Sequence, residues 1–137
     1  MIIGICGLIG TGKGTVADIL VEQGFVKVNF ADKLKDGVST IFGWDRAMLE
    51  GDTDESRKWR EEKDSFWSRE LDDHITPRAV LQMFGTDCMR NCFHQDIWVQ
   101  LLKQKLLANP EQNHVVPDVR FENEIKMLRG IGGQVWE

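Results

Sequence analysis

The sequence predicts an α/β fold in which short, mostly parallel strands alternate with helices. Apolar runs of strand length alternate with segments whose apolar residues recur at helical spacing. A glycine-rich turn follows the first apolar run, residues 1–6, and a helical pattern follows the turn. The length of 137 residues suits a core of several strands and helices. We therefore expect residues 1–137 to form a single domain.

The glycine-rich turn has the composition of a phosphate-binding loop. The spacing Gly7-x4-Gly12-Lys13 places flexible backbone N–H groups directly before a helix N-terminus, which favours anions. Lys13 can reach the outer phosphates as a mobile point charge. The next residue, Gly14, stands where Ser or Thr usually binds magnesium. The alternative is a glycine-rich turn in an ordinary α/β protein. We predict nucleoside triphosphate binding by Gly10, Thr11, Gly12, Lys13, Gly14 and Thr15.

Charge and cysteine content exclude several classes of function. A net charge of −5 gives no electrostatic basis for general nucleic-acid binding. No apolar run approaches the roughly 20 residues that cross a bilayer, so we expect no membrane association. The three cysteines lack the spacing of a disulfide framework, and a cytoplasmic location is expected. We interpret Cys88 and Cys92 as small buried apolar side chains and not, together with nearby His94, as metal ligands.

The elements that follow the loop alternate between helix and strand. The first helix is expected to end near Gln23, with Gly24 as its C-terminal cap. Residues 25–30 alternate sufficiently to predict a second strand. A further helix is expected from Ala31 to about Gly43, with an apolar stripe that faces the core.

The stretch from Trp44 to Thr76 has a different character, with acidic and basic residues in near alternation. We predict a helical insertion on the substrate side over about residues 44–76. One interpretation is a solvated helical excursion whose tryptophans pack on the body of the protein. The other is a mobile substrate cover, as occurs where a phosphoryl group must be shielded from water.

Thr76 and Pro77 predict the start of another helix, as an N-cap followed by proline at the first helical position. This helix is expected to continue through Met89 or beyond. Arg78 and Gln82 lie four residues apart and therefore share a face, whereas Arg90 lies further round. Gly85, within the helix, could allow another chain segment or a ligand to approach closely.

The remaining elements predict where polar groups meet the loop. A helix is expected from Asp96 to about Asn109, a buried strand over residues 114–120, a helix over 121–128 and a strand over 134–137. We expect the first strand to be central and paired in parallel with the strand that ends at Asp118. Ligands bind at the carboxyl ends of such strands, so Asp118 and Arg120 are expected beside the phosphate loop. An acidic side chain there can hold magnesium.

Several motifs together resemble the phage deoxynucleoside monophosphate kinases, a branch of the P-loop nucleotide kinases. The resemblance extends over nearly the whole chain, and it implies a three-layer P-loop kinase fold. Its most selective parts are Thr-Pro-Arg-x3-Gln-x2-Gly-Thr, which begins at Thr76, and Pro-Asp-x-Arg, which begins at Pro117. The other matching pieces are residues 7–18, 30–35, 84–87, 93–98 and 116–121.

The resemblance implies transfer of the γ-phosphoryl group of ATP to a deoxynucleoside 5′-monophosphate, with Mg2+. Lys13 and the loop amides would hold the ATP phosphates, and Thr15 would hydrogen-bond one of them. Asp118 would orient hydrated Mg2+, and Arg120 would stabilise charge on the transferring group. The loop ending Gly-Lys-Gly-Thr also resembles adenylate kinases, in which water supplies much of the magnesium coordination, so Gly14 fits. For the acceptor, the candidates by position are Arg78 for the phosphate, Gln82 for the base, and Arg90.

The resemblance also implies a departure at the C-terminal end. Family members usually continue beyond the strand that this chain reaches at Trp136, and the continuation supplies a lid, a last strand and an adenine-contacting loop. An exposed sheet edge would favour self-association as a homodimer. Two alternatives therefore stay open: another small-molecule P-loop kinase, or a nucleotide-binding module that is inactive because the chain is incomplete.

Overall fold

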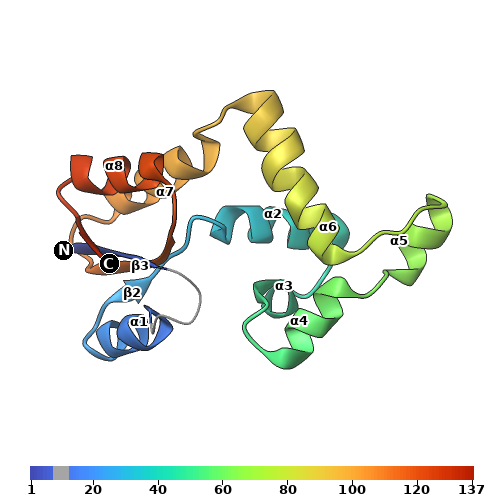
Figure 1. Ribbon diagram of the computed structural model, residues 1–137, viewed down its shortest axis with the longest axis horizontal. Coiled ribbons are helices and arrows are strands. Elements are labelled where there is room, and N and C mark those ends of the chain that lie inside the picture. Colours follow the sequence, from blue (N-terminus) through green and yellow to red (C-terminus); the bar gives the residue numbers. More distant parts are fainter. Residues whose placement is uncertain (8–12) are drawn as a thin grey trace. The chain divides into compact units, whose positions relative to one another are not determined.

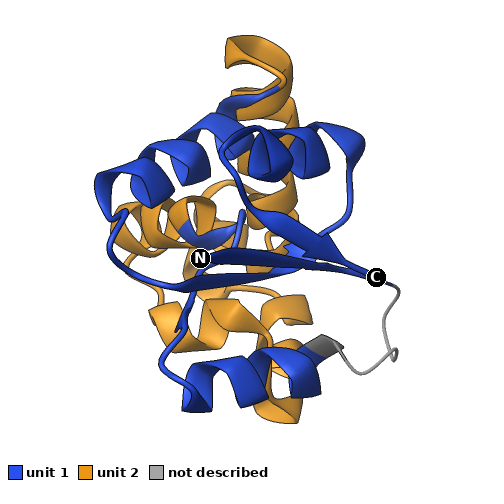
Figure 2. Ribbon diagram, turned by 90° about the vertical axis from the view of Figure 1, so that its left-hand side faces the viewer, with its two compact units in different colours: residues 1–32, 96–137 blue, residues 33–95 orange. Residues whose placement is uncertain are grey.

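The computed structural model describes residues 1–7 and 13–137, with side chains from Gly14 onward in the second range. The chain is organised as two compact units (Figure 2). The first unit comprises Met1–Asp32 and Asp96–Glu137, and the second comprises Lys33–Gln95. Both are parts of the stretch that was expected to form a single domain, and each is described in turn.

The first unit is built on a four-stranded sheet with the order β2-β3-β1-β4. Its strands are β1 (Ile2–Cys6), β2 (Val26–Lys27), β3 (His114–Val119) and β4 (Gln134–Trp136). All three strand pairs are parallel. This confirms the prediction that the first strand is internal and lies beside the strand that contains Asp118.

Three helices cover the two faces of this sheet. They are α1 (Lys13–Glu22), α7 (Ile97–Ala108) and α8 (Glu122–Gly130). Figure 1 shows α7 and α8 on one face and α1 on the other, which gives three layers. Each face has its own apolar core, one around α1 and a larger one beneath α7 and α8. The α/β class and the layered architecture predicted from the sequence are confirmed.

Close packing in the larger core requires a glycine in β1. A Cβ atom at Gly4 would lie 2.7 Å from Leu128 Cδ1 and 3.1 Å from Val119 Cγ2. Because Leu128 is fully buried, it cannot move aside without opening the core. Gly4 therefore allows α8 to approach the sheet.

The predicted second strand, residues 25–30, is longer than the observed one. Val26–Lys27 pairs with β3, and the Val28 N–H donates to the Val115 carbonyl at 3.0 Å. The N–H of Phe30 instead donates to the side chain of Asp118. The strand stops early because this carboxylate, distant in sequence, replaces a ladder partner.

The second unit consists of helices joined by short turns. They are α2 (Asp32–Phe42), α3 (Arg46–Glu50), α4 (Asp54–Glu61), α5 (Ser65–Glu70), α6 (Pro77–Gln82) and the π-helix η1 (Met83–Phe93). Side chains that accept backbone N–H bonds start four of them, namely Asp45, Thr53, Asp64 and Thr76. The helical character of residues 44–76 and the start at Thr76-Pro77 agree with the sequence prediction.

Aromatic side chains form much of the interior of the second unit. Phe42 stacks on Trp44 with ring centroids 4.7 Å apart, and it meets Trp67 and Phe84 edge to face. Trp44 also contacts Trp59 edge to face, at 6.0 Å. We call these five residues the aromatic cluster. The tryptophans of the charged stretch thus pack within their own unit.

Candidate functional site

The carboxyl edge of the first unit's sheet carries the polar residues predicted from the sequence. Cys6, at the end of β1, pairs with Val119, at the end of β3. Gly7 and Arg120 follow these two strands at the same edge, since the strands run parallel. Ligands of open α/β sheets bind at this edge. The strand and the helix expected on either side of a phosphate loop are present as β1 and α1, while residues 8–12 lie outside the described residues.

An irregularity in β3 determines how Asp118 leaves the sheet. The pairing with β1 shifts between Gly4, which is opposite Val116, and Cys6, which is opposite Val119. Val116 and Val119 are three residues apart, yet both pack in the larger core, which strict alternation would not allow. One extra residue is therefore accommodated near Pro117 and Asp118. Bulges of this kind redirect side chains beside functional sites.

The Asp118 carboxylate accepts the Phe30 N–H, with Oδ2 at 3.0 Å and Oδ1 at 3.2 Å from the nitrogen. Burial raises the pKa of Asp118 from 3.8 to about 6. The hydrogen bond from Phe30 opposes this rise, and the nearby negative charge of Glu124 adds to it. The carboxyl group therefore changes charge close to neutral pH.

Glu124 holds the turn that follows Asp118. Its side chain is buried, and Oε1 accepts the N–H of Arg120 at 2.8 Å and the N–H of Phe121 at 2.9 Å. In the sequence, Glu124 lies in the first turn of the helix expected over residues 121–128. The spacing Phe121-x-x-Glu124 carries the missed signal, because a Glu three residues after an N-cap position can bond back to it. Glu124 thereby fixes the backbone from which the exposed Arg120 side chain projects.

Asp32 fixes the other side of this edge. Its Oδ2 accepts the Asn29 N–H at 2.8 Å, and its Oδ1 lies 3.4 Å from Asn29 Nδ2. Together with Asp118, it holds the turn between β2 and α2. The motif Phe30-Ala31-Asp32 thus has a structural function at the carboxyl edge.

The phosphate loop itself falls largely outside the described residues. Gly10, Thr11, Gly12 and the side chain of Lys13 are among the residues that the structure does not describe. Gly14 and Thr15 are exposed in the first turn of α1. Their positions agree with a loop that leads into a helix N-terminus, and their contacts with a nucleotide stay a prediction.

The acceptor candidates all belong to the second unit. Arg78 and Gln82 are exposed on α6, and Arg90 is half-buried on η1. The Arg78 guanidinium pairs with Glu61 of α4, with Nη1 2.6 Å from Oε1, and both side chains are more than 60% exposed, at 63% and 62%. Arg78 is thus presented to solvent while it is paired with a carboxylate that a phosphate could replace.

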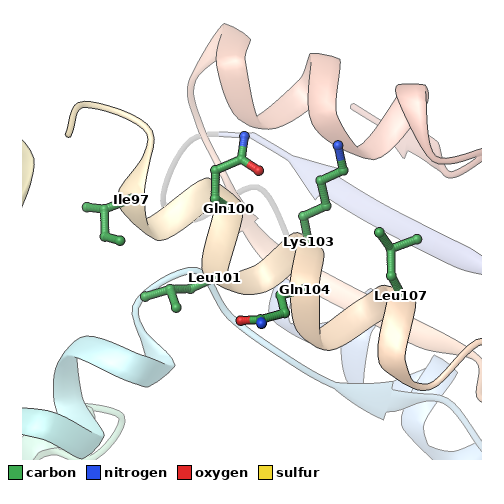
Figure 3. A pocket seen from close by; sticks show the side chains of 6 residues that line it. All are labelled: Ile97, Gln100, Leu101, Lys103, Gln104 and Leu107. Atoms are coloured by element: carbon green, nitrogen blue, oxygen red, sulfur yellow. The ribbon is translucent and has the colours of Figure 1, made fainter.

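Outside these sites, the described part of the chain, residues 1–7 and 13–137, carries free cysteines and a surface hollow. In this part of the chain, no group of three or more His, Cys, Asp or Glu side chains could hold a metal ion, and the three cysteines are free. Cys88 and Cys92 are exposed, so the prediction that they are buried apolar side chains is wrong. None of its helices is long and apolar enough to cross a membrane. An open hollow of about 400 Å³ lies along α7 (Figure 3). None of the predicted site residues lines this hollow; it is formed by Ile97, Gln100, Leu101, Lys103, Gln104 and Leu107.

The parallel sheet and the helical layers on its two faces define an α/β protein of the P-loop kinase type. The family model for deoxynucleotide monophosphate kinases matches residues 46–136. The chain belongs to this family of phosphotransferases. The match confirms the kinase interpretation over the alternatives that the sequence left open.

Two relatives from viruses agree with the family match. A mimivirus protein (Acanthamoeba polyphaga mimivirus), named as a deoxynucleotide monophosphate kinase, is 32% identical over 145 residues. The alignment covers 97% of this chain and 70% of the relative. The deoxynucleoside-5′-monophosphate kinase of Escherichia phage T5 is 40% identical over 55 residues, which cover 40% of this chain and 22% of the phage protein.

Proposed function

We propose that this kinase uses ATP and Mg2+ at the carboxyl edge of the first unit and binds the deoxynucleoside monophosphate through the second unit. The observation that carries the proposal is the parallel pairing of β1 with β3. It brings the end of the strand with Asp118 to the edge at which the connection from β1 to α1 begins. Phosphoryl transfer depends mainly on positioning and charge neutralisation, so the placement of these groups is decisive.

The donor side is assigned to the phosphate loop. The backbone of Gly10, Thr11, Gly12 and Gly14 would bind phosphate oxygens, Thr15 would hydrogen-bond one of them, and Lys13 would supply a positive charge. Arg120 would stabilise charge on the transferring group, from a backbone position that Glu124 fixes.

Asp118 fits a hydrated magnesium ion better than a directly bound one. Its two oxygens already accept the Phe30 N–H, and the described residues supply no three-ligand cluster. Mg2+ keeps several water ligands in kinase sites, where it neutralises phosphate charge. An ionised Asp118 can accept hydrogen bonds from such water molecules and orient them.

The acceptor side is assigned to Arg78, Gln82 and Arg90. A guanidinium group matches the geometry of a phosphate, and an amide can hydrogen-bond a base. Arg78 would exchange Glu61 for the acceptor phosphate. Since the pair is exposed, this exchange costs about 1 kcal/mol or less.

Coupled assays of ADP release test this proposal. We expect turnover with at least one of dGMP, dTMP and modified dCMP, and none with a sugar acid or phosphomevalonate. Lys13→Ala is expected to lower ATP affinity at least about tenfold by calorimetry, because it removes a charge-assisted contact of about 1.5–3 kcal/mol. Lys103→Ala, on the exposed hollow of α7, is the matched control.

The opposite results would overturn it. Turnover with a non-nucleotide acceptor alone would contradict the acceptor assignment. ATP binding without ADP formation for every acceptor would instead indicate a nucleotide-binding module. Unchanged ATP affinity in Lys13→Ala would mean that the loop has a purely structural function.

A homodimer forms part of the proposal, because β4 lies at an edge of the sheet. Sedimentation analysis over a range of protein concentrations tests it. A single monomeric species at every concentration would reject it.

A further inference from the structure

The helix that begins at Pro77 changes type after Gln82. α6 passes directly into η1, a π-helix of 11 residues. At its end, the His94 N–H donates to the Met89 carbonyl, five residues earlier, at 3.0 Å. Most π-helical segments are single turns, and they are frequent at functional sites. A π-helix of this length calls for an explanation.

The change of helix type alters which side chains share a face. In an α-helix, a step of four residues passes a full turn by about 40°. Three such steps from Arg78 would carry Arg90 about 120° away, which is why the sequence predicted Arg90 further round. A π-helix has more than four residues per turn, because its bonds join residues five apart. A step of four residues in a π-helix therefore falls short of a full turn. The side chains then rotate about the helix axis in the direction opposite to that in an α-helix.

The reversal brings four polar side chains into one line along the helix. From Arg78 to Gln82, in α6, the side chains rotate one way about the helix axis, and through Thr86 to Arg90, in η1, they rotate back. We call Arg78, Gln82, Thr86 and Arg90 the polar stripe. Its first two members are exposed and its last two are half-buried. In this register, Arg90 is expected on the same face as the other three.

Packing on another side fixes the rotation of the helix. Val80 and Leu81 are buried in the core of the second unit, and Gly85 is buried as well. A Cβ atom at Gly85 would lie 2.9 Å from Leu34 Cδ2. This contact confirms the prediction that Gly85 allows a close approach of another segment. The polar stripe is therefore held in place by apolar contacts that do not involve its own members.

We propose that the polar stripe is the acceptor-recognition face and that the π-helical register assembles it, with Thr86 as a further specificity-determining residue. This inference rests on the proposed function. The Arg78 guanidinium, at one end of the stripe, favours the anionic part of a deoxynucleoside monophosphate. Further along, the Gln82 amide, the Thr86 hydroxyl and the Arg90 guanidinium can hydrogen-bond its uncharged part. A purely α-helical segment would instead carry Arg90 about 120° round the helix from Arg78.

Calorimetric titration with dGMP and with dTMP, in the absence of ATP, tests the role of Thr86. Thr86→Val keeps the branched shape and removes the hydroxyl, and we expect about a three- to tenfold weaker Kd for the preferred nucleotide. Thr40→Val is the matched control, since Thr40 is an exposed hydroxyl on α2 that bonds to the Asp36 carbonyl. Its Kd is expected to stay within about twofold of wild type.

Deletion of Asp87 tests the register. Asp87 is exposed between Thr86 and Arg90, and its removal shortens η1 by one residue. We expect the deletion to weaken acceptor binding as much as Arg90→Ala does, with ATP affinity retained as the sign of a folded first unit. If the deletion variant does not fold, Thr86→Val decides the question.

The outcomes separate this inference from the proposed function. The stripe would be overturned, and the acceptor assignment left intact, if Arg78→Ala weakens monophosphate binding while Thr86→Val and a folded deletion variant keep the wild-type Kd. Unchanged Kd values in Arg78→Ala, Arg90→Ala and Thr86→Val would overturn both. Weaker monophosphate binding in all three of these variants, with the Kd of Thr40→Val unchanged, supports the stripe.

Discussion

The Phe30 N–H donates a hydrogen bond to the Asp118 carboxylate, with Oδ2 at 3.0 Å and Oδ1 at 3.2 Å from the nitrogen. This bond connects the turn after β2 to the end of β3. The two residues are 88 positions apart in the chain. Their bond places a buried carboxylate, whose pKa is raised to about 6, at the edge where ligands are expected. Stability and catalysis are therefore expected to depend on the same ionisation.

The stability of the protein is expected to fall as Asp118 ionises. The folded-state pKa of about 6 exceeds the ordinary 3.8, so the folded state binds the proton more tightly. The contribution of protonated Asp118 to the free energy of unfolding is fully present below about pH 4, and it is lost as the pH rises through about 6. A shift of this size corresponds to at most about 3 kcal/mol. Urea unfolding of Asp118→Asn and wild type measures this effect. The free energy of unfolding of the variant, relative to that of wild type, should increase by up to that amount between pH 4 and 7. A constant difference would contradict this prediction.

Turnover is expected to require the ionised form of Asp118. Only the carboxylate can accept bonds from magnesium-bound water through both oxygens. Wild-type kcat should therefore fall as the pH is lowered through about 6. Asp118→Asn should lose about 10- to 100-fold in magnesium-dependent rate, as other outer-sphere changes do. Magnesium titrations of the two proteins that superimpose would reject this role.

Removal of the Glu61 charge is expected to release Arg78 for the acceptor. Glu61→Gln weakens the ion pair, whose members are exposed, so the effect is modest. We expect KM for the monophosphate to fall by up to about fivefold, with kcat little changed. Glu55→Gln, the same change in the first turn of α4, is the control. An equal effect of both variants would indicate a general change in charge.

Gly51 and Gly37 are expected to respond oppositely to alanine. Gly51 has a φ of 71°, and a Cβ atom there would lie 2.3 Å from Arg60 Cζ. Arg60 would have to move and give up its bond to the Leu49 carbonyl. Gly51→Ala should cost about 1–2 kcal/mol. Gly37→Ala, in α2 with open space at its Cβ position, should stabilise by up to about 1 kcal/mol. The shift of the denaturant midpoint measures both changes in stability, provided that the dependence of the unfolding free energy on denaturant concentration stays the same.

The order of elements could be predicted because it depends on local sequence. Apolar periodicity located β1, α1, α7 and β3, and glycine marked helix ends where the backbone adopts positive φ. Gly24 and Gly43, which end the first two predicted helices, have φ values of 97° and 70°. The position of Asp118 beside β1 followed from the rule for parallel crossovers.

Features that depend on distant contacts could not be predicted. The second strand was expected through Phe30, because the competing carboxylate lies in another part of the sequence. The bulge at Pro117 and Asp118 follows from packing in the core beneath α7 and α8. The π-helical register likewise has no signal in apolar spacing, which suits an α-helix equally well. The proposed place of Arg90 in the polar stripe depends on this register.

The aromatic cluster also provides an optical signal. The chain has five tryptophans and no tyrosine, so indole groups dominate its ultraviolet emission. Three of the five, Trp44, Trp59 and Trp67, belong to the second unit. Trp44 donates its indole N–H to Asp64 at 3.1 Å, and Trp67 and Trp59 contact other members of the cluster. The intrinsic fluorescence of the unlabelled protein is thus weighted toward the unit assigned to the acceptor.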